Sequence, residues 1–446
     1  VCRCLRRKPL GDGRTLIVGP QHALSKVEGM AYSDQYAYKP VLTSEGAPPP
    51  PDGHSVQQPL TGQYGQQYGQ YGDPYQEEPH GCAKECQGIT GILCTWMNIL
   101  LVFVPLGIYS HMASWSAAAR FSCNFTAIVP LAAILGASTE ALAAHTGQMI
   151  GGLLNATFGN AVEMIVTVNA IKAGLVNVVQ GSLLGSILSN MLLVLGMSFF
   201  AAGVVEKESK FSAKGASANM TCLTLGSIAL ALPTIYNCME NTSTEDVLSI
   251  SRISSAVIAM VYVLFLIFQL LTHAHLFAAD GEEEEEVSIS ACSSILLLLG
   301  ATLAVAVCSE FLVDSIEGVT EEYGLPGAFI GVILLPIVGN AAEHATAVTV
   351  AAKGKMDLAL GVAVGSSTQI ALLVVPFSVI VGWVFDVPMS LDFRIFDTTV
   401  MILSVFITHT ALQDGCSNWL EGSILIAIYI LIAIICWYIP DTDGQT

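Results

Sequence analysis

Two short motifs each place a carboxylate inside an apolar stretch of the chain. The segments Gly159–Glu163 and Gly339–Glu343 read GNAVE and GNAAE. A charged side chain at the centre of a lipid bilayer costs ~2.5–3.5 kcal/mol on insertion scales, so a carboxylate in such a position indicates a functional site. In each motif the asparagine and the glutamate are three residues apart and share one face of a helix. Carboxylate and amide oxygens are hard donors of the kind that Ca²⁺ binds.

We predict that the two motifs hold a cation between them. The predicted ligands are two carboxylates, two amides and the backbone at two glycines, namely Glu163, Glu343, Asn160, Asn340, Gly159 and Gly339. Glycine lets another backbone approach closely, and a local helix break exposes carbonyl oxygens. A zinc or copper site is disfavoured because no Cys or multiple-His cluster accompanies the motifs, whereas Mn²⁺ accepts the same oxygen ligands and stays open.

The same carboxylates can exchange a cation for protons. Burial and mutual repulsion favour the protonated form of a carboxylate, and the field of a divalent cation favours the ionised form. The predicted site therefore holds either one cation or about two protons at a time. Ca²⁺ and H⁺ are then cargo, and the sequence predicts no cofactor.

Three titratable residues lie near the motifs. Glu140 and Glu310 each stand in the span before a motif, and His344 follows Glu343 directly. The two glutamates are predicted either to give access to the site and support its ligands or to make plain hydrogen bonds between helices. His344 is predicted either to relay or gate protons or to pack as a neutral side chain.

The motifs belong to an internal repeat. At an offset of 180 residues the two motifs align, and so do Gly181 with Gly361, Gly185 with Gly365 and Ser186 with Ser366. The matched spans are five crossings apart, and an odd number means that the copies enter the membrane from opposite sides. Inverted repeats of this kind are typical of secondary transporters, whose substrate sites lie near the midplane where the repeats meet.

The elements that must position these residues are membrane-spanning helices. The chain has 446 residues, of which 53% are hydrophobic and only 12% charged. We predict an all-α polytopic membrane protein of about eleven transmembrane helices, one N-terminal helix followed by two inverted five-helix repeats. The predicted spans are 91–110, 122–143, 148–171, 177–204, 217–236, 248–272, 289–312, 326–352, 357–384, 394–412 and 419–439.

The predicted organisation has five parts. They are a disordered cytosolic tail (1–88), the first transmembrane helix (89–111), repeat 1 (121–272), an acidic cytosolic linker (273–288) and repeat 2 (289–440). This composition excludes a soluble enzyme, a fibre and a single-anchor protein, and the net charge of −19 argues against nucleic acid as a partner. The lipid bilayer is the predicted surrounding, and whether the chain forms a homo-oligomer stays open.

Lysine and arginine in the short loops predict that the N-terminus is cytosolic, because basic loops stay on the cytosolic side. The linker then carries a run of acidic residues in the cytosol. It is predicted either to be a solvated spacer or to attract cations and regulate transport, and its residues are Glu282, Glu283, Glu284, Glu285 and Glu286.

In its two motifs and the helices that follow them, the sequence resembles the calcium/proton exchanger (CAX) branch of the calcium/cation antiporter superfamily, vacuolar type. In the first repeat the resemblance rests on Gly159–Glu163, Gln180–Ser182 and Gly185–Asn190. In the second repeat it rests on Leu335–Ala345 and Gly365–Ala371. It covers about residues 90–440, and the Asn-Ala-Ala-Glu-His form is specific to this branch.

The resemblance implies an eleven-span antiporter that exchanges cytosolic Ca²⁺ for luminal H⁺, usually at a vacuolar membrane. It implies that Glu163 and Glu343 are the exchange carboxylates, that Ser189 and Gln369 are neighbouring polar ligands or gates, and that Glu282–Glu286 belong to a cytosolic acidic helix. An exchanger for Mn²⁺, Na⁺ or K⁺, or a Na⁺-coupled Ca²⁺ exchanger, stays open as the alternative. A passive channel and an intramembrane enzyme are disfavoured, because the carboxylates sit singly in an inverted repeat and no His-Glu-x-x-His motif is present.

Overall fold

The structure is a computed structural model that describes residues 6–9, 15–18, 81–146, 148–277 and 289–439. The chain divides into two compact units, Val1–Pro74 and Tyr75–Thr446. In the first unit β1 (Arg6–Pro9) pairs with β2 (Thr15–Val18) in antiparallel fashion. The acidic run Glu282–Glu286 and most of the predicted tail lie outside the described residues.

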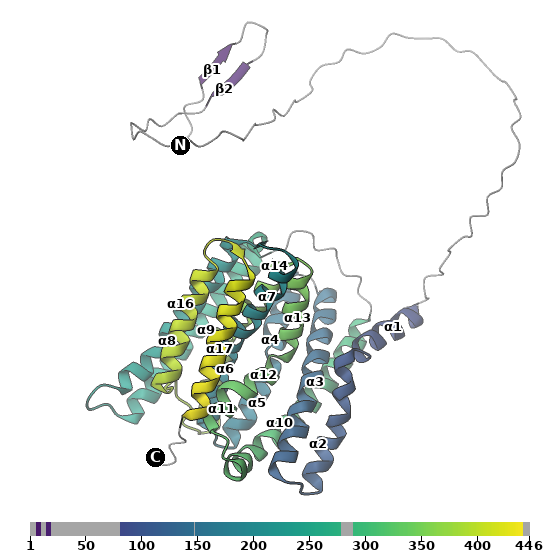
Figure 1. Cartoon of the computed structure of the whole chain (residues 1–446), viewed down its shortest axis with the longest axis vertical. Coiled ribbons are helices and arrows are strands. Elements are labelled where there is room, and N and C mark those ends of the chain that lie inside the picture. Colours follow the sequence, from purple (N-terminus) through teal and green to yellow (C-terminus); the bar gives the residue numbers. More distant parts are fainter. Residues whose placement is uncertain (1–5, 10–14, 19–80, 147, 278–288, 440–446) are drawn as a thin grey trace, which may run out of the picture. The chain divides into compact units, whose positions relative to one another are not determined.

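The second unit is a helical bundle (Figure 1). In the first half of the chain its helices are α1 (Gly81–Leu93), η1 (Trp96–Val102), α2 (Phe103–Met112), α3 (Ala117–Thr146), α4 (Gln148–Phe158), α5 (Ala161–Lys172), α6 (Val176–Leu188), η2 (Ser189–Val194), α7 (Leu195–Val205), α8 (Ala213–Asn237), α9 (Thr244–Ile267), η3 (Phe268–Thr272) and η4 (Ala274–Leu276). In the second half they are α10 (Ala291–Tyr323), α11 (Gly327–Phe329), η5 (Ile330–Leu334), α12 (Leu335–Gly339), α13 (Ala341–Ala352), α14 (Met356–Gln369), η6 (Ile370–Val374), α15 (Val375–Val384), α16 (Ile395–Ala411) and α17 (Trp419–Tyr438). A two-residue strand β3 (Ser209–Lys210) pairs with β4 (Cys416–Ser417).

The polytopic helical class is confirmed for the part of the chain that the structure describes. There, seven helices are long and apolar enough to cross a membrane, or up to nine if each bent pair counts as one span. Ile395–Ala411 is a shorter apolar helix. Every predicted span coincides with a helix or a run of helices, and the count of eleven stays a prediction.

Two boundaries at the start of this unit differ from the prediction. The tail was predicted to extend to residue 88, but α1 is helical from Gly81, and Glu85 accepts hydrogen bonds from the hydroxyls of Ser290 and Ser293. The first predicted span is not one straight helix, because Glu85–Leu93 and Trp96–Met112 meet at an angle of 73°. Composition does not reveal that α1 is helical, because its contact with Ser290 and Ser293 joins residues far apart in the sequence.

The internal repeat of the sequence recurs in the helices. Adding 180 to the bounds of α5 gives those of α13, and the same shift maps α6, η2 and α7 onto α14, η6 and α15 to within one residue. In Figure 1 the chain descends from α4 to α5 and climbs from α11 and α12 to α13. The two motif-bearing segments therefore run in opposite directions.

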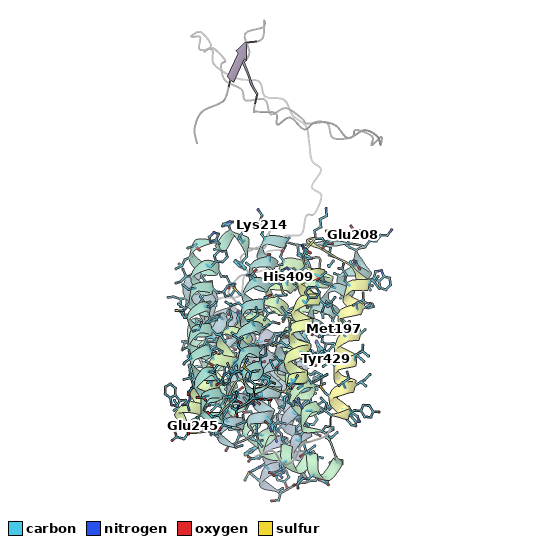
Figure 2. The ribbon with its side chains drawn as sticks, turned by 90° about the vertical axis from the view of Figure 1, so that its left-hand side faces the viewer. Met197, Glu208, Lys214, Glu245, His409 and Tyr429 are labelled. Carbon is cyan, nitrogen blue, oxygen red and sulfur yellow. The ribbon has the colours of Figure 1, made fainter. Side chains whose placement is uncertain are left out.

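The two ends of the bundle can be told apart by labelled residues. Figure 2 shows Glu208 and Lys214 at one end, which we call the Lys214 end, and Glu245 at the other, which we call the Glu245 end. At the Glu245 end the connection between α15 and α16 is folded inward, since Met389, Leu391 and Phe393 are 1%, 0% and 3% exposed.

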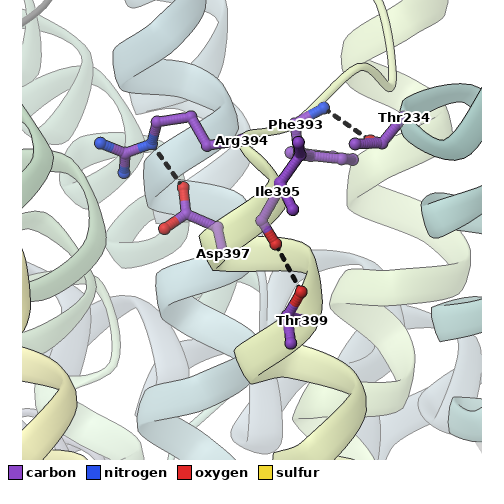
Figure 3. Close-up of polar contacts among 6 residues, drawn as sticks. All are labelled: Thr234, Phe393, Arg394, Ile395, Asp397 and Thr399. Carbon is purple, nitrogen blue, oxygen red and sulfur yellow. Dashed lines mark hydrogen bonds and ion pairs between the residues drawn. The ribbon is translucent and has the colours of Figure 1, made fainter. Parts of the chain in front are cut away.

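Side chains from other helices hold this connection. Thr234 of α8 accepts from the Phe393 backbone N–H at 3.0 Å (Figure 3). Its hydroxyl also donates to the Leu391 carbonyl at 3.2 Å. Ser251 of α9 accepts from the Leu391 N–H at 2.9 Å. Because these groups are buried, they would otherwise lack partners, so the bonds fix how the connection closes the Glu245 end.

The substitution Thr234→Val should destabilise the protein by about 1–3 kcal/mol, because it keeps the shape of the side chain and leaves two buried backbone groups of the connection unpaired. Thermal unfolding of the purified protein measures the loss. The matched control is Thr399→Val, which removes an exposed hydroxyl bonded at 2.7 Å to Ile395 within its own helix (Figure 3). Equal stability of the two variants would contradict the prediction.

Candidate functional site

Both motif helices break at the motif. Asn160 and Asn340 leave helical geometry, with φ/ψ of −104°/19° and −90°/13°, and each is the residue before a new helix, α5 or α13. The segments Gly327–Gly339 and Ala341–Ala352 meet at 57°. Glu163 and Glu343 consequently stand in the first turn of a half-helix, where the positive end of the helix dipole favours a negative charge.

The breaks bring the two carboxylates together from opposite halves. Glu163 is only 8% exposed, and its Oε1 would lie 2.8 Å from a Cβ placed on Gly339, the last residue of α12. Any larger residue than glycine at 339 would push on this carboxylate. Glu163 and Glu343 are near enough to repel one another electrostatically. The two motifs, predicted to pair, therefore lie next to each other, and their role as one binding site stays a prediction.

Several oxygens of the site have no hydrogen-bond partner among the described residues. They are both carboxylate oxygens of Glu163, Oε2 of Glu343 and Oδ1 of Asn340. An unsatisfied buried polar group costs about 1–3 kcal/mol, and an unpaired charge costs more. These four oxygens of the two motifs are a donor set that either a cation or protons would satisfy, and their chemistry fits the hard cations predicted from the sequence.

The amide nitrogens of the motifs bond across the two halves. Asn160 Nδ2 donates to Gln369 Oε1 at 2.7 Å, and Asn340 Nδ2 donates to the Ser186 carbonyl at 3.3 Å. These bonds fix the direction of each amide. Gln369, which the resemblance implies to be a polar ligand or gate, is in direct contact with a motif residue.

Ser189 and His344 also meet. Ser189 Oγ and His344 Nε2 share a hydrogen bond of 3.2 Å between η2 and α13. His344 therefore contacts another predicted site residue, which leaves both of its predicted roles standing. Ser189 and Gln369 each lie where a wider helical turn begins, since η2 starts at Ser189 and η6 follows Gln369. Such π-type turns often mark functional sites, and residue patterns do not reveal them.

Glu140 and Glu310 are not shown to contact the motif residues. Both side chains are exposed on α3 and α10, whereas their neighbours Thr139 and Ser309 are 1% and 0% exposed. Ser309 accepts from Asn169 Nδ2 of α5 at 2.7 Å. Neither glutamate is among the residues that line the two cavities described next, and their roles stay predictions.

Two cavities lie near the motif residues. The smaller one, of about 20 Å³, surrounds Glu163 with apolar side chains such as Ile128 and Leu312. The larger one, of about 100 Å³, extends from Ser212 and Asp357 to Gln369, with polar residues along it. Ser212 stands just before Lys214, so this cavity belongs to the Lys214 end of the bundle (Figure 2). The larger cavity reaches Gln369, which bonds Asn160, and the smaller one reaches the Glu163 carboxylate itself.

Equivalent glycines of the two halves differ in how much space surrounds them. A Cβ on Gly185 would lie 2.2 Å from the Val332 carbonyl oxygen and 2.5 Å from Pro336 Cγ. A Cβ on Gly365, its counterpart, would meet no atom of the described chain within 4 Å, and Gly365 lines the larger cavity. One half of the inverted pair is packed tightly and the other is open.

Comparison with known proteins agrees with this architecture. The family model described as sodium/calcium exchanger protein matches residues 116–271 and 293–438. A vacuolar calcium ion transporter of Schizosaccharomyces pombe is 42% identical over 78% of this chain and 86% of its own length. A Ca²⁺/H⁺ antiporter of Aphanothece halophytica is 43% identical over 76% of this chain and 96% of its own.

Solved structures show the same fold. Native YfkE is 36% identical, with a TM-score of 0.68 over 77% of this chain and 100% of that one. The H⁺/Ca²⁺ exchanger CAX has a TM-score of 0.60 over 79% of this chain and 92% of that one, at 16% identity. Both halves of the helical unit are matched by the family model, and relatives above 40% identity cover most of the chain, so the chain belongs to the sodium/calcium exchanger protein family.

Proposed function

We propose that this protein is a secondary antiporter that exchanges cytosolic Ca²⁺ for luminal H⁺ across a vacuolar or other acidic-organelle membrane. The observation that carries the proposal is the pair of carboxylates, Glu163 and Glu343, which meet from opposite halves with oxygens unpartnered in the described chain. The names of the relatives, Ca²⁺/H⁺ antiporter and vacuolar calcium ion transporter, support it.

In this proposal each residue has a defined task. Glu163 and Glu343 bind Ca²⁺ when ionised and carry protons when it leaves. Asn340 Oδ1 adds an oxygen ligand, while Asn160 is held in place by Gln369. Ser189 and His344, which share a hydrogen bond, would relay protons to or from the carboxylates. No bond of the cargo is made or broken, so the protein is a transporter and not an enzyme.

Alternating access is the proposed way in which the site changes sides. The larger cavity, which reaches Gln369 from the Lys214 end, would be the access route, and positively charged loops assign that end to the cytosol. The two repeats, 121–272 and 289–440, would exchange their tight and open packing to face the lumen. The tail, the first helix and the linker with Glu282–Glu286 would then be cytosolic or peripheral to this core.

The test is uptake of ⁴⁵Ca²⁺ into vesicles that contain the purified full chain. An inside-acid pH gradient should drive accumulation above equilibrium, and collapse of the gradient should stop it. Uphill accumulation excludes a passive channel, and a matched Na⁺ gradient separates H⁺ coupling from Na⁺ coupling. Competition by Mn²⁺, Na⁺ and K⁺ measures selectivity. No response to the pH gradient would refute the proposal.

A further inference from the structure

The larger cavity contains polar residues that no motif includes. Besides Gln369 it is lined by Asp357 of α14, Asn219 of α8 and Gln269 of η3. Asp357 is the only charged residue among those described as lining it, and its carboxylate is the cavity's source of negative charge. The cavity volume of about 100 Å³ leaves room for a cation with several of its waters.

Asp357 lies at the outer part of this cavity. Its Oδ1 accepts the backbone N–H of Ser212 at 2.7 Å, where Ser212 precedes α8. This bond uses one carboxylate oxygen and ties the starts of α8 and α14 together. Asp357 and Gln369 are about 18 Å apart along α14 at 1.5 Å per residue, so Asp357 is far from the exchange carboxylates.

Asn219 lies further inward. It is only 6% exposed, and its Oδ1 has no hydrogen-bond partner in the described part of the chain. Its backbone carbonyl accepts from Thr368 Oγ1 at 3.4 Å, which holds Asn219 beside the residue that precedes Gln369. A buried amide oxygen without a partner, in a cavity that also carries a carboxylate, can act as an oxygen ligand for a cation or for one of its waters.

We propose that Asp357 and Asn219 form a capture path for a hydrated divalent cation, with Asp357 drawing the ion into the cavity and Asn219 contacting it beside Gln369. This inference rests on the proposed function, because it describes how the cargo reaches the exchange carboxylates. The path sets how fast and how selectively cations arrive, whereas Glu163 and Glu343 set whether exchange occurs. The two residues should therefore act on KM and leave kcat nearly unchanged.

The experiment measures initial ⁴⁵Ca²⁺ uptake against Ca²⁺ concentration in vesicles that contain the full chain. Asp357→Asn keeps an oxygen that can accept the Ser212 N–H and removes the charge, so KM should rise about fivefold and the rise should shrink at high salt. Asn219→Leu should raise KM about tenfold, and Asn219→Asp should restore it. The matched control is Asp414→Asn, because Asp414 accepts the Cys416 N–H at 3.1 Å in the same way but does not line the cavity.

Each outcome decides the matter. If Asp357→Asn matches the Asp414→Asn control, or if it lowers kcat and thermal stability at constant KM, Asp357 only caps a helix and the proposal is wrong. If Asn219→Asp fails to restore KM, Asn219 is a packing residue. Wild-type protein that shows no pH-driven uptake would refute the proposed function instead, so the two failures are distinguishable.

Discussion

Glu163→Gln and Glu343→Gln should each lower pH-driven Ca²⁺ uptake at least about 100-fold while the protein stays folded. Glutamine has the size of glutamate and keeps one oxygen, but it carries no charge and binds no exchangeable proton. Loss of one of two ionic ligands then costs ~2.8 kcal/mol or more, at about 1.4 kcal/mol for each tenfold change. Either carboxylate alone leaves the cation half-neutralised and the proton count incomplete.

The same variants make a second measurement possible. Without Ca²⁺ the wild-type site brings together two carboxylates that repel each other unless they bind protons, with oxygens unpartnered in the described chain. A neutral glutamine relieves this repulsion, so the variants should unfold at an equal or higher temperature than wild type in metal-free buffer. Added Ca²⁺ should stabilise wild type and neither variant, because a ligand that binds only the folded state raises its stability.

The control for both measurements is Glu317→Gln, which changes an exposed glutamate of α10 outside both cavities. It should transport and respond to Ca²⁺ as wild type does. Retained exchange in Glu163→Gln or in Glu343→Gln would remove that residue from the site. Loss of expression in both would be a folding effect and would contradict the prediction of unchanged stability.

Much of the fold and the pairing of the motifs could be predicted from the sequence. Long apolar runs leave few alternatives to membrane helices, because the backbone must satisfy its own hydrogen bonds there. The repeat at an offset of 180 residues predicted the pairing of the motifs, because identical residues in the two inverted copies adopt the same local structure. The breaks at Asn160 and Asn340 confirm this, for they occur at the same place in each motif.

Other features depend on contacts that no pattern records. Asn219 lies outside every motif, and only its burial beside Thr368 and its unpartnered oxygen single it out. Helix α1 begins at Gly81, and its Glu85 accepts hydrogen bonds from Ser290 and Ser293, contacts far apart in the chain that composition does not record. The difference between Gly185 and Gly365 could not be predicted at all, because both copies carry the same residue and the asymmetry belongs to one conformation.

Gly185→Ala and Gly365→Ala should have opposite effects on stability. At Gly185 the added methyl group would meet the Val332 carbonyl at 2.2 Å, a backbone atom that cannot move aside without shifting η5. Overpacking of this kind costs about 1–3 kcal/mol or more, so Gly185→Ala should unfold at a clearly lower temperature. At Gly365 the methyl group meets open space, and alanine favours the helix by about 1 kcal/mol, so stability should hold or rise.

Transport, however, should fail in both variants, and this makes the pair a test of alternating access. If the halves exchange packing, Gly365 must approach the counterparts of Val332 and Pro336, which the offset of 180 identifies as Gly152 and Ala156 on α4. A methyl group at 365 then blocks the second state without harming the first. Gly365→Ala should therefore be stable, be stabilised by Ca²⁺ as wild type is, and exchange at least about tenfold more slowly, as measured by thermal unfolding and ⁴⁵Ca²⁺ uptake on one preparation. Wild-type exchange by Gly365→Ala would show that the open half never closes in the way its partner does, and the inverted halves would then not take turns.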